Sequence, residues 1–168
     1  MKTIIIILSA AALIFFIAQA FIMQSTQKTE KHKYSVLKDF GSFEIRKYEP
    51  ALFSYVVMQA DSYKSVSSKG FGKLAGYIFG GNEKDQKIAM TTPVAMSMDD
   101  SVTMKFKIPE GMTLDEMPKP TNSEVRFQSE PEKIVATIRF DGWSSDESIE
   151  KNTQKLLQLL AENNIDHN

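Results

Sequence analysis

GFGKLAGYIFGGNEKDQKIAMTTPVAM, the stretch Gly70–Met96, carries the strongest structural pattern in the chain. Within it, Phe71, Leu74 and Ile78 recur at helical spacing, with Tyr77 beside them. Apolar side chains at this spacing lie on one side of a helix, so the pattern predicts an apolar and aromatic helix face. No catalytic group stands out in the stretch, and we interpret the face as an apolar wall.

A glycine turn and a strand follow this helix face. The turn Gly80–Asn82 ends the helix, because glycine adopts the left-handed backbone conformation found after helices. Residues 88–96 then predict a strand that contains Met90 and Pro93. Proline donates no backbone hydrogen bond, so Pro93 marks a sheet edge, a bulge or a strand end. The stretch therefore predicts a helix, a turn and a strand packed as one unit.

Composition favours one folded domain. The chain has 168 residues, of which 42% are hydrophobic and 24% are charged. This length is sufficient for a domain with a core of its own. A net charge of −1 supplies no positive field for nucleic acid, so we expect no nucleic-acid partner. The absence of cysteine excludes disulfides, thiolate catalysis and cysteine-ligated metal clusters.

The N-terminal segment 1–23 is predicted to be a signal anchor or a signal peptide outside the folded domain. Residues 4–23 are apolar except for one serine and one glutamine. About 20 helical residues span roughly 30 Å, the thickness of a bilayer core. A small-x-small site at 18–20 fits a cleaved signal peptide, whereas the apolar run beyond that site favours an uncleaved anchor. We expect the segment to contact a membrane.

Residues 24–33, QSTQKTEKHK, are polar and aperiodic, and they predict a flexible linker between this segment and the domain.

Lysines after the apolar run outnumber the single lysine before it. On charge bias alone, this difference keeps the downstream side in the cytoplasm. A short leading apolar segment more often exports the domain behind it. We therefore favour a membrane-anchored or exported protein whose domain lies on the extracytoplasmic side.

The remaining chain, 34–168, predicts an α+β domain. Helical spacing predicts helices at 61–79 and 145–162, the second opened by a capping box of Ser144 and Glu147. The β-α order repeats, so we expect two pseudo-repeated β-α-β-β halves in a curved, mainly antiparallel sheet or distorted barrel that carries both helices. Alternating and β-branched runs predict strands at 34–38, 43–48, 51–60, 88–96, 102–108, 124–128 and 133–140.

Trp143 is the one tryptophan of the chain and follows the last predicted strand. An indole ring at a strand end buries a large apolar surface while its N–H reaches a polar partner. We therefore expect Trp143 to be a packing anchor rather than a platform for a ligand.

Four ordered motifs make the chain resemble the SOUL family of haem-binding proteins. They are FEIRKYEPAL at 43–52, the stretch 71–96, PKP at 118–120 and RFDGW at 139–143. The resemblance implies that the domain binds haem or another tetrapyrrole in an apolar groove beside its first helix, without catalysis. Members of the family continue through two further strands after the last helix. No matching motif follows here, so we expect the second half to lack those strands.

The resemblance places the ligand beside the first helix. We expect the groove to be lined by Phe71, Leu74, Tyr77, Ile78 and Met90. In some family members the variable position of the IRxYxP motif is a histidine suited to ligating iron, but here it is Lys47. A lysine ligates iron only when deprotonated, which is costly for a group with a pKa of about 10.4. His32 and His167 lie in presumed tails, so we expect apolar contact rather than a metal ligand to hold the ring.

The sequence does not predict an enzyme. It shows no catalytic triad, no paired metal-ligand pattern and no phosphate-binding loop. Tetrapyrrole binding is the leading hypothesis, and the alternatives are a general hydrophobic-ligand module and a membrane-tethered scaffold without a small ligand. Four methionines cluster in two successive predicted strands, either as core filler or as lining for a hydrophobic ligand: Met90, Met96, Met98 and Met104.

Overall fold

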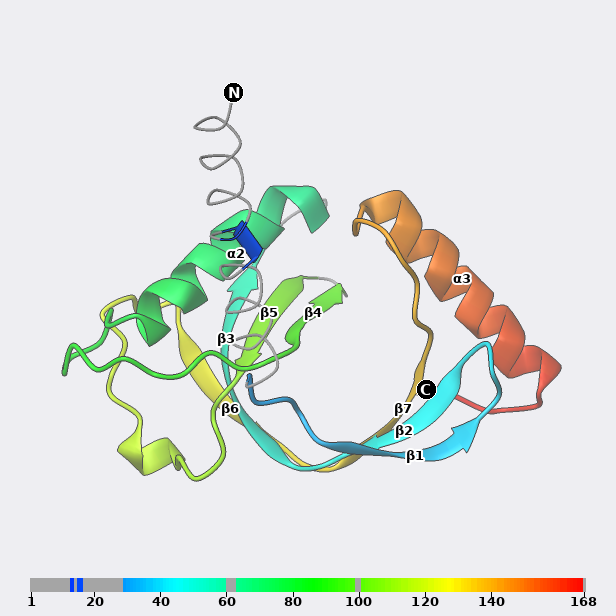
Figure 1. The fold of residues 1–168 in the computed structure, drawn as a ribbon, viewed down its shortest axis with the longest axis horizontal. Coiled ribbons are helices and arrows are strands. Elements are labelled where there is room, and N and C mark those ends of the chain that lie inside the picture. Colours follow the sequence, from blue (N-terminus) through cyan, green and yellow to red (C-terminus); the bar gives the residue numbers. More distant parts are fainter. Residues whose placement is uncertain (1–12, 14, 17–28, 60–62, 99–100, 168) are drawn as a thin grey trace. The chain divides into compact units, whose positions relative to one another are not determined.

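The computed structural model describes residues 13, 15–16, 29–59, 63–98 and 101–167, and Figure 1 shows their fold. Contacts divide the chain into Met1–Glu30 and Lys31–Asn168, and the described strands all lie in the second part. No helix within the described ranges is long and apolar enough to cross a membrane. The predicted N-terminal anchor falls almost wholly outside these ranges, so it stays a prediction.

The domain Lys31–Asn168 contains both predicted helices. They are α2, Tyr63–Ile78, and α3, Asp146–Glu162, and a short 3-10 turn occupies Leu114–Glu116. The strands are β1 Tyr34–Asp39, β2 Glu44–Tyr48, β3 Ala51–Met58, β4 Val94–Met98, β5 Val102–Lys107, β6 Arg126–Glu130 and β7 Lys133–Thr137. No strand follows α3 in the described part, which ends at residue 167.

The strands form two antiparallel sheets. One sheet has the order β1-β2-β7 and the other has the order β4-β5-β3-β6. The α+β class and the antiparallel pairing are therefore confirmed. The sheets do not close into a barrel, so the described strands favour the open alternative over the distorted barrel.

Two prolines explain why there are two sheets rather than one. Tyr48 of β2 pairs with Lys133 of β7, and Ala51 of β3 pairs with Glu130 of β6. An unchanged register across this gap places Pro50 opposite Pro131. Neither proline has a backbone N–H for the ladder, so pairing stops there and both strands bend from one sheet into the other. Figure 1 shows the resulting curved path of β2 into β3, with β7 and β6 beside it.

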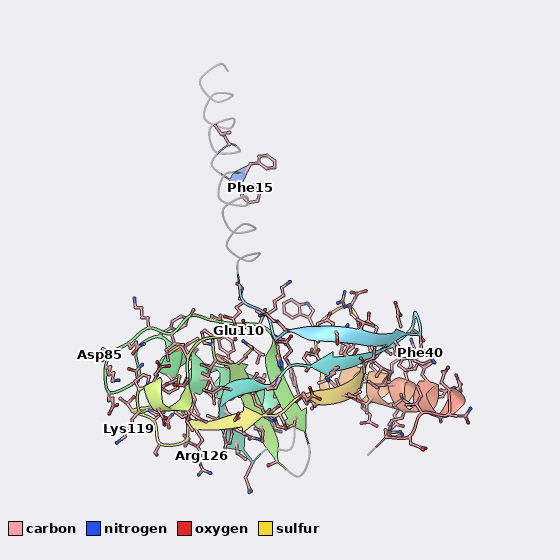
Figure 2. All side chains as sticks on the ribbon, turned by 90° about the horizontal axis from the view of Figure 1, so that it is seen from below. Phe15, Phe40, Asp85, Glu110, Lys119 and Arg126 are labelled. Atoms are coloured by element: carbon pink, nitrogen blue, oxygen red, sulfur yellow. The ribbon has the colours of Figure 1, made fainter. Side chains whose placement is uncertain are left out.

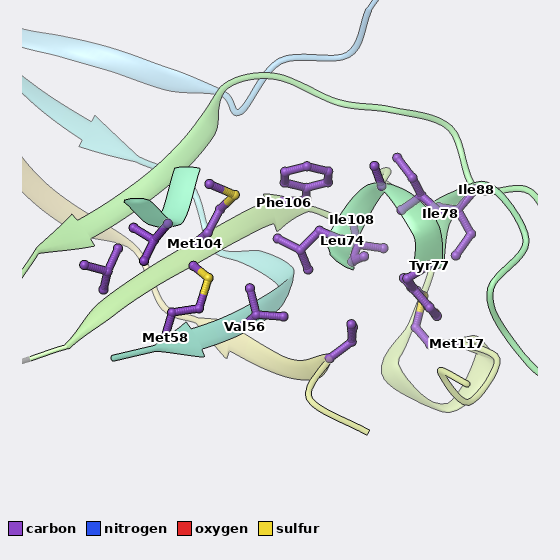
Figure 3. Close-up of a cluster of buried hydrophobic side chains, with 14 residues drawn as sticks. Val56, Met58, Leu74, Tyr77, Ile78, Ile88, Met104, Phe106, Ile108 and Met117 are labelled. Atoms are coloured by element: carbon purple, nitrogen blue, oxygen red, sulfur yellow. The ribbon is translucent and has the colours of Figure 1, made fainter. Parts of the chain in front are cut away.

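Helix α2 covers one face of the four-stranded sheet and forms the main core with it. Leu74, Tyr77 and Ile78 are buried against residues of β3 and β5, which confirms the predicted apolar helix face. Figure 3 shows Leu74 beside Val56 and Phe106, with Tyr77 and Ile78 further along the core. Burial raises the pKa of the Tyr77 hydroxyl to about 12. The protonated hydroxyl donates a hydrogen bond of 3.0 Å to the carbonyl of Pro118.

The glycines of α2 have two different environments. A Cβ atom added to Gly70 would lie 2.5 Å from the terminal methyl of Met58, so a small residue here permits close packing of helix on sheet. The methyl is the end of a flexible side chain, so this contact favours a small residue at position 70 without requiring glycine. A Cβ added to Gly72 or Gly76 would meet no atom within 4 Å. Close packing therefore does not account for these two glycines.

The predicted glycine turn ends α2. Gly80 has a φ of 116°, and the N–H of Gly81 donates to the carbonyl of Gly76 at 2.8 Å. Asn82 is buried, and its amide donates to the carbonyls of Tyr77 and Gln86. This asparagine therefore ties the helix end to the following loop.

The strand predicted at 88–96 is shorter than expected. Ile88 is buried, and its N–H donates to the carbonyl of Ile78 at the end of α2. This residue is therefore hydrogen-bonded to the helix end and not to a neighbouring strand. Strand β4 begins only at Val94, after the cis peptide bond between Thr92 and Pro93. Because β4 is an edge strand, the prediction that Pro93 marks an edge or a strand end is confirmed.

Two expectations near α3 are wrong. The cap is one residue later than predicted, because Ser145 accepts from the N–H of Ser148 and the side chain of Ser148 accepts from the N–H of Ser145. Trp143 is not a packing anchor, since 95% of its surface is exposed. The last strand ends at Thr137 instead of reaching residue 140, so Trp143 does not lie at a strand end as expected.

Candidate functional site

An apolar hollow of about 520 Å³ lies between the first half of α2 and the edge strand β4. We call it the α2–β4 groove. The groove is lined by residues of α2, β4 and β5 and by one residue of the loop before α3: Tyr63, Ser67, Ser68, Phe71, Val94, Met96, Met104 and Ser144. Apolar and aromatic side chains therefore make up most of the lining, and hydroxyl groups supply its polar part.

The groove exposes apolar side chains that a ligand could cover. Phe71 keeps 39% of its surface exposed and Val94 keeps 40%. Phe71 packs edge to face on Phe106, with ring centroids 5.3 Å apart, so its ring is held in place from below. Met96 of β4 pairs directly with Met104 of β5, which brings two adaptable thioether side chains to the same wall.

The predicted lining residues divide between the groove and the core. Phe71 lines the α2–β4 groove. Leu74, Tyr77 and Ile78 belong to the buried core beneath the helix, and Met90 is partly exposed in the loop before β4. The geometry therefore does not bring the five together in one groove, and a contact of each with haem stays a prediction.

Sequence reasoning assigned no ligand role to Val94, which the structure places on the groove. Met96 and Met104 were recognised as either core filler or ligand lining, without a choice between them. The signal available in the sequence was the even spacing of Val94 and Met96, since alternate strand residues share a face. What the sequence lacked was the position of α2 over that face.

A second hollow, of about 470 Å³, lies along the glycine side of α2. Gly72, Gly76 and Tyr77 line it together with Thr121 of the loop before β6. Lys73 pairs with Glu124 at 2.8 Å at this side of the helix, and that hydrogen bond lowers the pKa of the Glu124 carboxyl. Ser68 lines both hollows, so they adjoin across the helix.

His32 does not lie in a flexible tail as expected. Its ring nitrogen Nε2 lies 2.8 Å from the carbonyl oxygen of Glu49, and its backbone N–H donates to Thr92 at 2.9 Å. The ring packs on Tyr48 and Phe53, with centroids 4.9 Å and 5.5 Å away. The polar residues before His32 predicted a linker, and no local pattern revealed this packing because its contacts are with β2 and β3, later in the chain.

None of the three residues considered as iron ligands lines the α2–β4 groove. Lys47 is partly exposed on β2 and pairs with Glu132 at 2.9 Å. His167 lines a different hollow beside α3, and His32 packs on Phe53. The described residues contain no group of three or more histidine, cysteine or acidic side chains arranged to hold a metal ion.

The sequence of this domain matches a known protein family. The model of the SOUL heme-binding protein family matches residues 29–168. The chain belongs to the SOUL family. The family resemblance of the sequence motifs is thereby confirmed, and the match covers the whole α+β domain with its α2–β4 groove.

Heme-binding protein relatives from vertebrates give the extent of the similarity. The chain is 35% identical to human heme-binding protein 2 over 129 residues, which cover 72% of this chain and 61% of the relative. The mouse protein of that name is also 35% identical, over 71% of this chain and 60% of its own length. Heme-binding protein 1 of Xenopus laevis is 24% identical over 74% and 69%. The chain spans about three fifths of the heme-binding protein 2 relatives that it matches.

Proposed function

We propose that this SOUL family chain binds haem or another tetrapyrrole in the α2–β4 groove, without catalysing a reaction. The observation that carries the proposal is the exposed apolar strip formed by Phe71 and Val94, with Met96 and Met104 beside it. A planar apolar ring laid on this strip would remove it from water. The names of the matched relatives supply the class of ligand.

The dimensions and chemistry of the groove suit such a ligand. A hollow of about 520 Å³ falls within the usual size range of ligand pockets. Covering one large apolar side chain contributes roughly 1.5–3 kcal/mol, so contact with a few of them would give measurable affinity without a bond to iron. The hydroxyl groups of Tyr63 and Ser67 lie at the groove and could accept or donate hydrogen bonds to the polar edge of a ligand.

Replacing Phe71 with aspartate should weaken haem binding by about tenfold to a hundredfold, because a charged group cannot cover the ring and the aromatic contact is lost. Titration of the full chain with haem, followed by absorbance, measures the change. The matched control is Phe79→Asp, since Phe79 is also exposed and directly follows the same helix but does not line the groove. Equal binding by wild type and the Phe71 variant, with both folded, would reject this groove as the site.

A general hydrophobic-ligand module is the second candidate function. The lining of the groove favours this function because most of it is apolar. Its methionines adapt to different ligands and do not select one ring system. A flat aromatic dye without metal or carboxylates, titrated beside haem, separates the two. Preference for haem supports a tetrapyrrole site, whereas equal affinity supports the general module.

We also propose that residues 4–23 attach the chain to a membrane, with the domain on the extracytoplasmic side. The apolar length of this run supports the proposal. Full-length chain should sediment with membranes, and a chain lacking residues 1–30 should remain in the soluble fraction. The cut is placed before Lys31 because Lys31 and Lys33 contact the domain. Lys31 forms a β-bridge with Thr92, and Lys33 pairs at 2.7 Å with Glu110, which is labelled in Figure 2. A shortened chain that still sediments would refute the anchor.

A further inference from the structure

A second cavity, separate from the groove, lies at the bend between the two sheets. It encloses about 260 Å³, and we call it the crease cavity. Phe53, Lys105 and Glu130 contribute to it from the four-stranded sheet, and Tyr48 and Lys133 contribute from the three-stranded sheet. The cavity therefore exists because the paired strands bend at their prolines.

The crease cavity uses the sheet face turned away from α2. Lys105 alternates along β5 with Met104 and Phe106, both of which belong to the core beneath the helix. Successive strand residues point to opposite faces, so Lys105 points away from that core. Met96, near the sheet edge, lines both the crease cavity and the α2–β4 groove. The two sites adjoin at this edge but present different side chains.

The charged groups of the cavity do not balance. The ammonium of Lys105 lies 2.5 Å from one carboxylate oxygen of Glu130, and that of Lys133 lies 2.7 Å from the other. Burial raises the pKa of the Glu130 carboxyl, but the hydrogen bonds from both lysines outweigh it and hold the pKa below its usual value. One carboxylate thus faces two ammonium groups. The wall carries one excess positive charge in a half-enclosed space, where charges are screened less than at an open surface.

An aromatic wall stands beside this charge. The ring of His32 packs on Tyr48 and Phe53, and its Nε2 is fixed by the carbonyl of Glu49. Val135 adds an aliphatic surface from β7. The rings are held by their own contacts, so the cavity presents a preformed apolar surface next to a cluster with a net positive charge.

We propose that the crease cavity binds a small aromatic carboxylic acid. The carboxylate of the ligand lies against Lys133 and Lys105 and balances the excess charge, while its ring packs against His32, Tyr48 and Phe53. A cavity of about 260 Å³ lies just below the usual size range for drug-sized ligands, which admits one or two fused rings and excludes a tetrapyrrole. This site is therefore distinct in ligand as well as in position from the α2–β4 groove.

Calorimetric titration of the full chain with 2-naphthoate tests the proposal, with neutral 2-naphthamide as the matched probe. We expect saturable binding of naphthoate and binding of the amide that is weaker by about tenfold or more, because a charged hydrogen bond to the lysines is lost. Lys133→Gln should weaken naphthoate by a similar factor. This variant removes the excess charge and leaves the Lys105–Glu130 pair intact. The Lys133 side chain is about half exposed, so the fold tolerates the change.

Two control variants distinguish binding in the crease cavity from a general effect of surface charge and from binding in the groove. Lys47→Gln removes the same charge from the same sheet, at a residue outside the cavity, and should leave the naphthoate affinity unchanged. Phe71→Asp should also leave it unchanged, whether or not haem binding in the groove is lost. The proposal is overturned if naphthoate shows no saturable binding, if the amide binds equally well, or if Lys47→Gln weakens binding as much as Lys133→Gln.

Discussion

Replacing Leu74 with alanine should lower the free energy of unfolding by about 3–5 kcal/mol. Leu74 lies at the centre of the core between α2 and the four-stranded sheet, with no exposed surface. The substitution removes buried methyl groups and leaves a cavity that the packed neighbours fill only in part. Chemical denaturation, with the midpoint and slope both recorded, measures the loss. Since a domain is typically stable by about 5–15 kcal/mol, this one change would remove a large share.

Phe79→Ala is the matched control for this prediction. Phe79 directly follows α2 and keeps most of its surface exposed, so its truncation should cost less than about 0.5 kcal/mol. Equal losses in the two variants would contradict the core assignment.

The burial of Leu74 and Ile78 also governs the design of binding experiments. A charged residue at Leu74 or Ile78 would reduce haem binding by unfolding the domain, whereas Phe71 can be changed at the surface of the groove.

Replacing Glu130 with glutamine should lower the free energy of unfolding at neutral pH by about 2–3 kcal/mol. Glu130 is 8% exposed and accepts hydrogen bonds from Lys105 and Lys133. The variant leaves both ammonium groups beside a neutral amide, and the more buried of them, Lys105, loses its counter-charge. Glu132→Gln is the matched control, because Glu132 pairs with Lys47 at an exposed position and should contribute less than about 1 kcal/mol.

The contribution of Glu130 should also depend on pH. Its pKa in the folded domain lies below the ordinary value of 4.5, because the two lysine hydrogen bonds outweigh the effect of burial. A depressed folded pKa stabilises the fold above the unfolded pKa, and this stabilisation is lost as pH falls through the folded pKa. The stability difference between wild type and Glu130→Gln should therefore be largest near neutral pH and shrink in acid. A difference that stays constant down to acid pH would contradict the ion-pair assignment.

Local patterns predicted the elements of this fold well where a segment is organised by its own residues. The apolar positions of α2 and the glycine turn after it were predicted from spacing alone, because a helix face and its end are properties of neighbouring residues. The family motifs predicted the same domain. Strand boundaries failed where distant contacts decide them, as at Ile88, which bonds to the end of α2 instead of entering β4.

The binding sites were harder to predict because they depend on the arrangement of elements. The sequence shows that Leu74, Tyr77 and Ile78 share a face with Phe71, but not that the first three point into the core while Phe71 lies at its rim. The polar run before β1 likewise hides that His32 packs on Phe53. The pairing of Lys105 with Glu130 joins strands separated by β3, so no local pattern reveals it.

Apolar contact with α2, rather than a bond to iron, is proposed to hold a tetrapyrrole in the groove. The most direct test is to titrate the full chain with haem and with metal-free protoporphyrin and compare the two dissociation constants. If apolar contact dominates, the constants should agree within about threefold, a difference of less than about 1 kcal/mol. Haem binding that is tighter by about a hundredfold, with an absorption spectrum of histidine-ligated iron, would contradict this mode of binding.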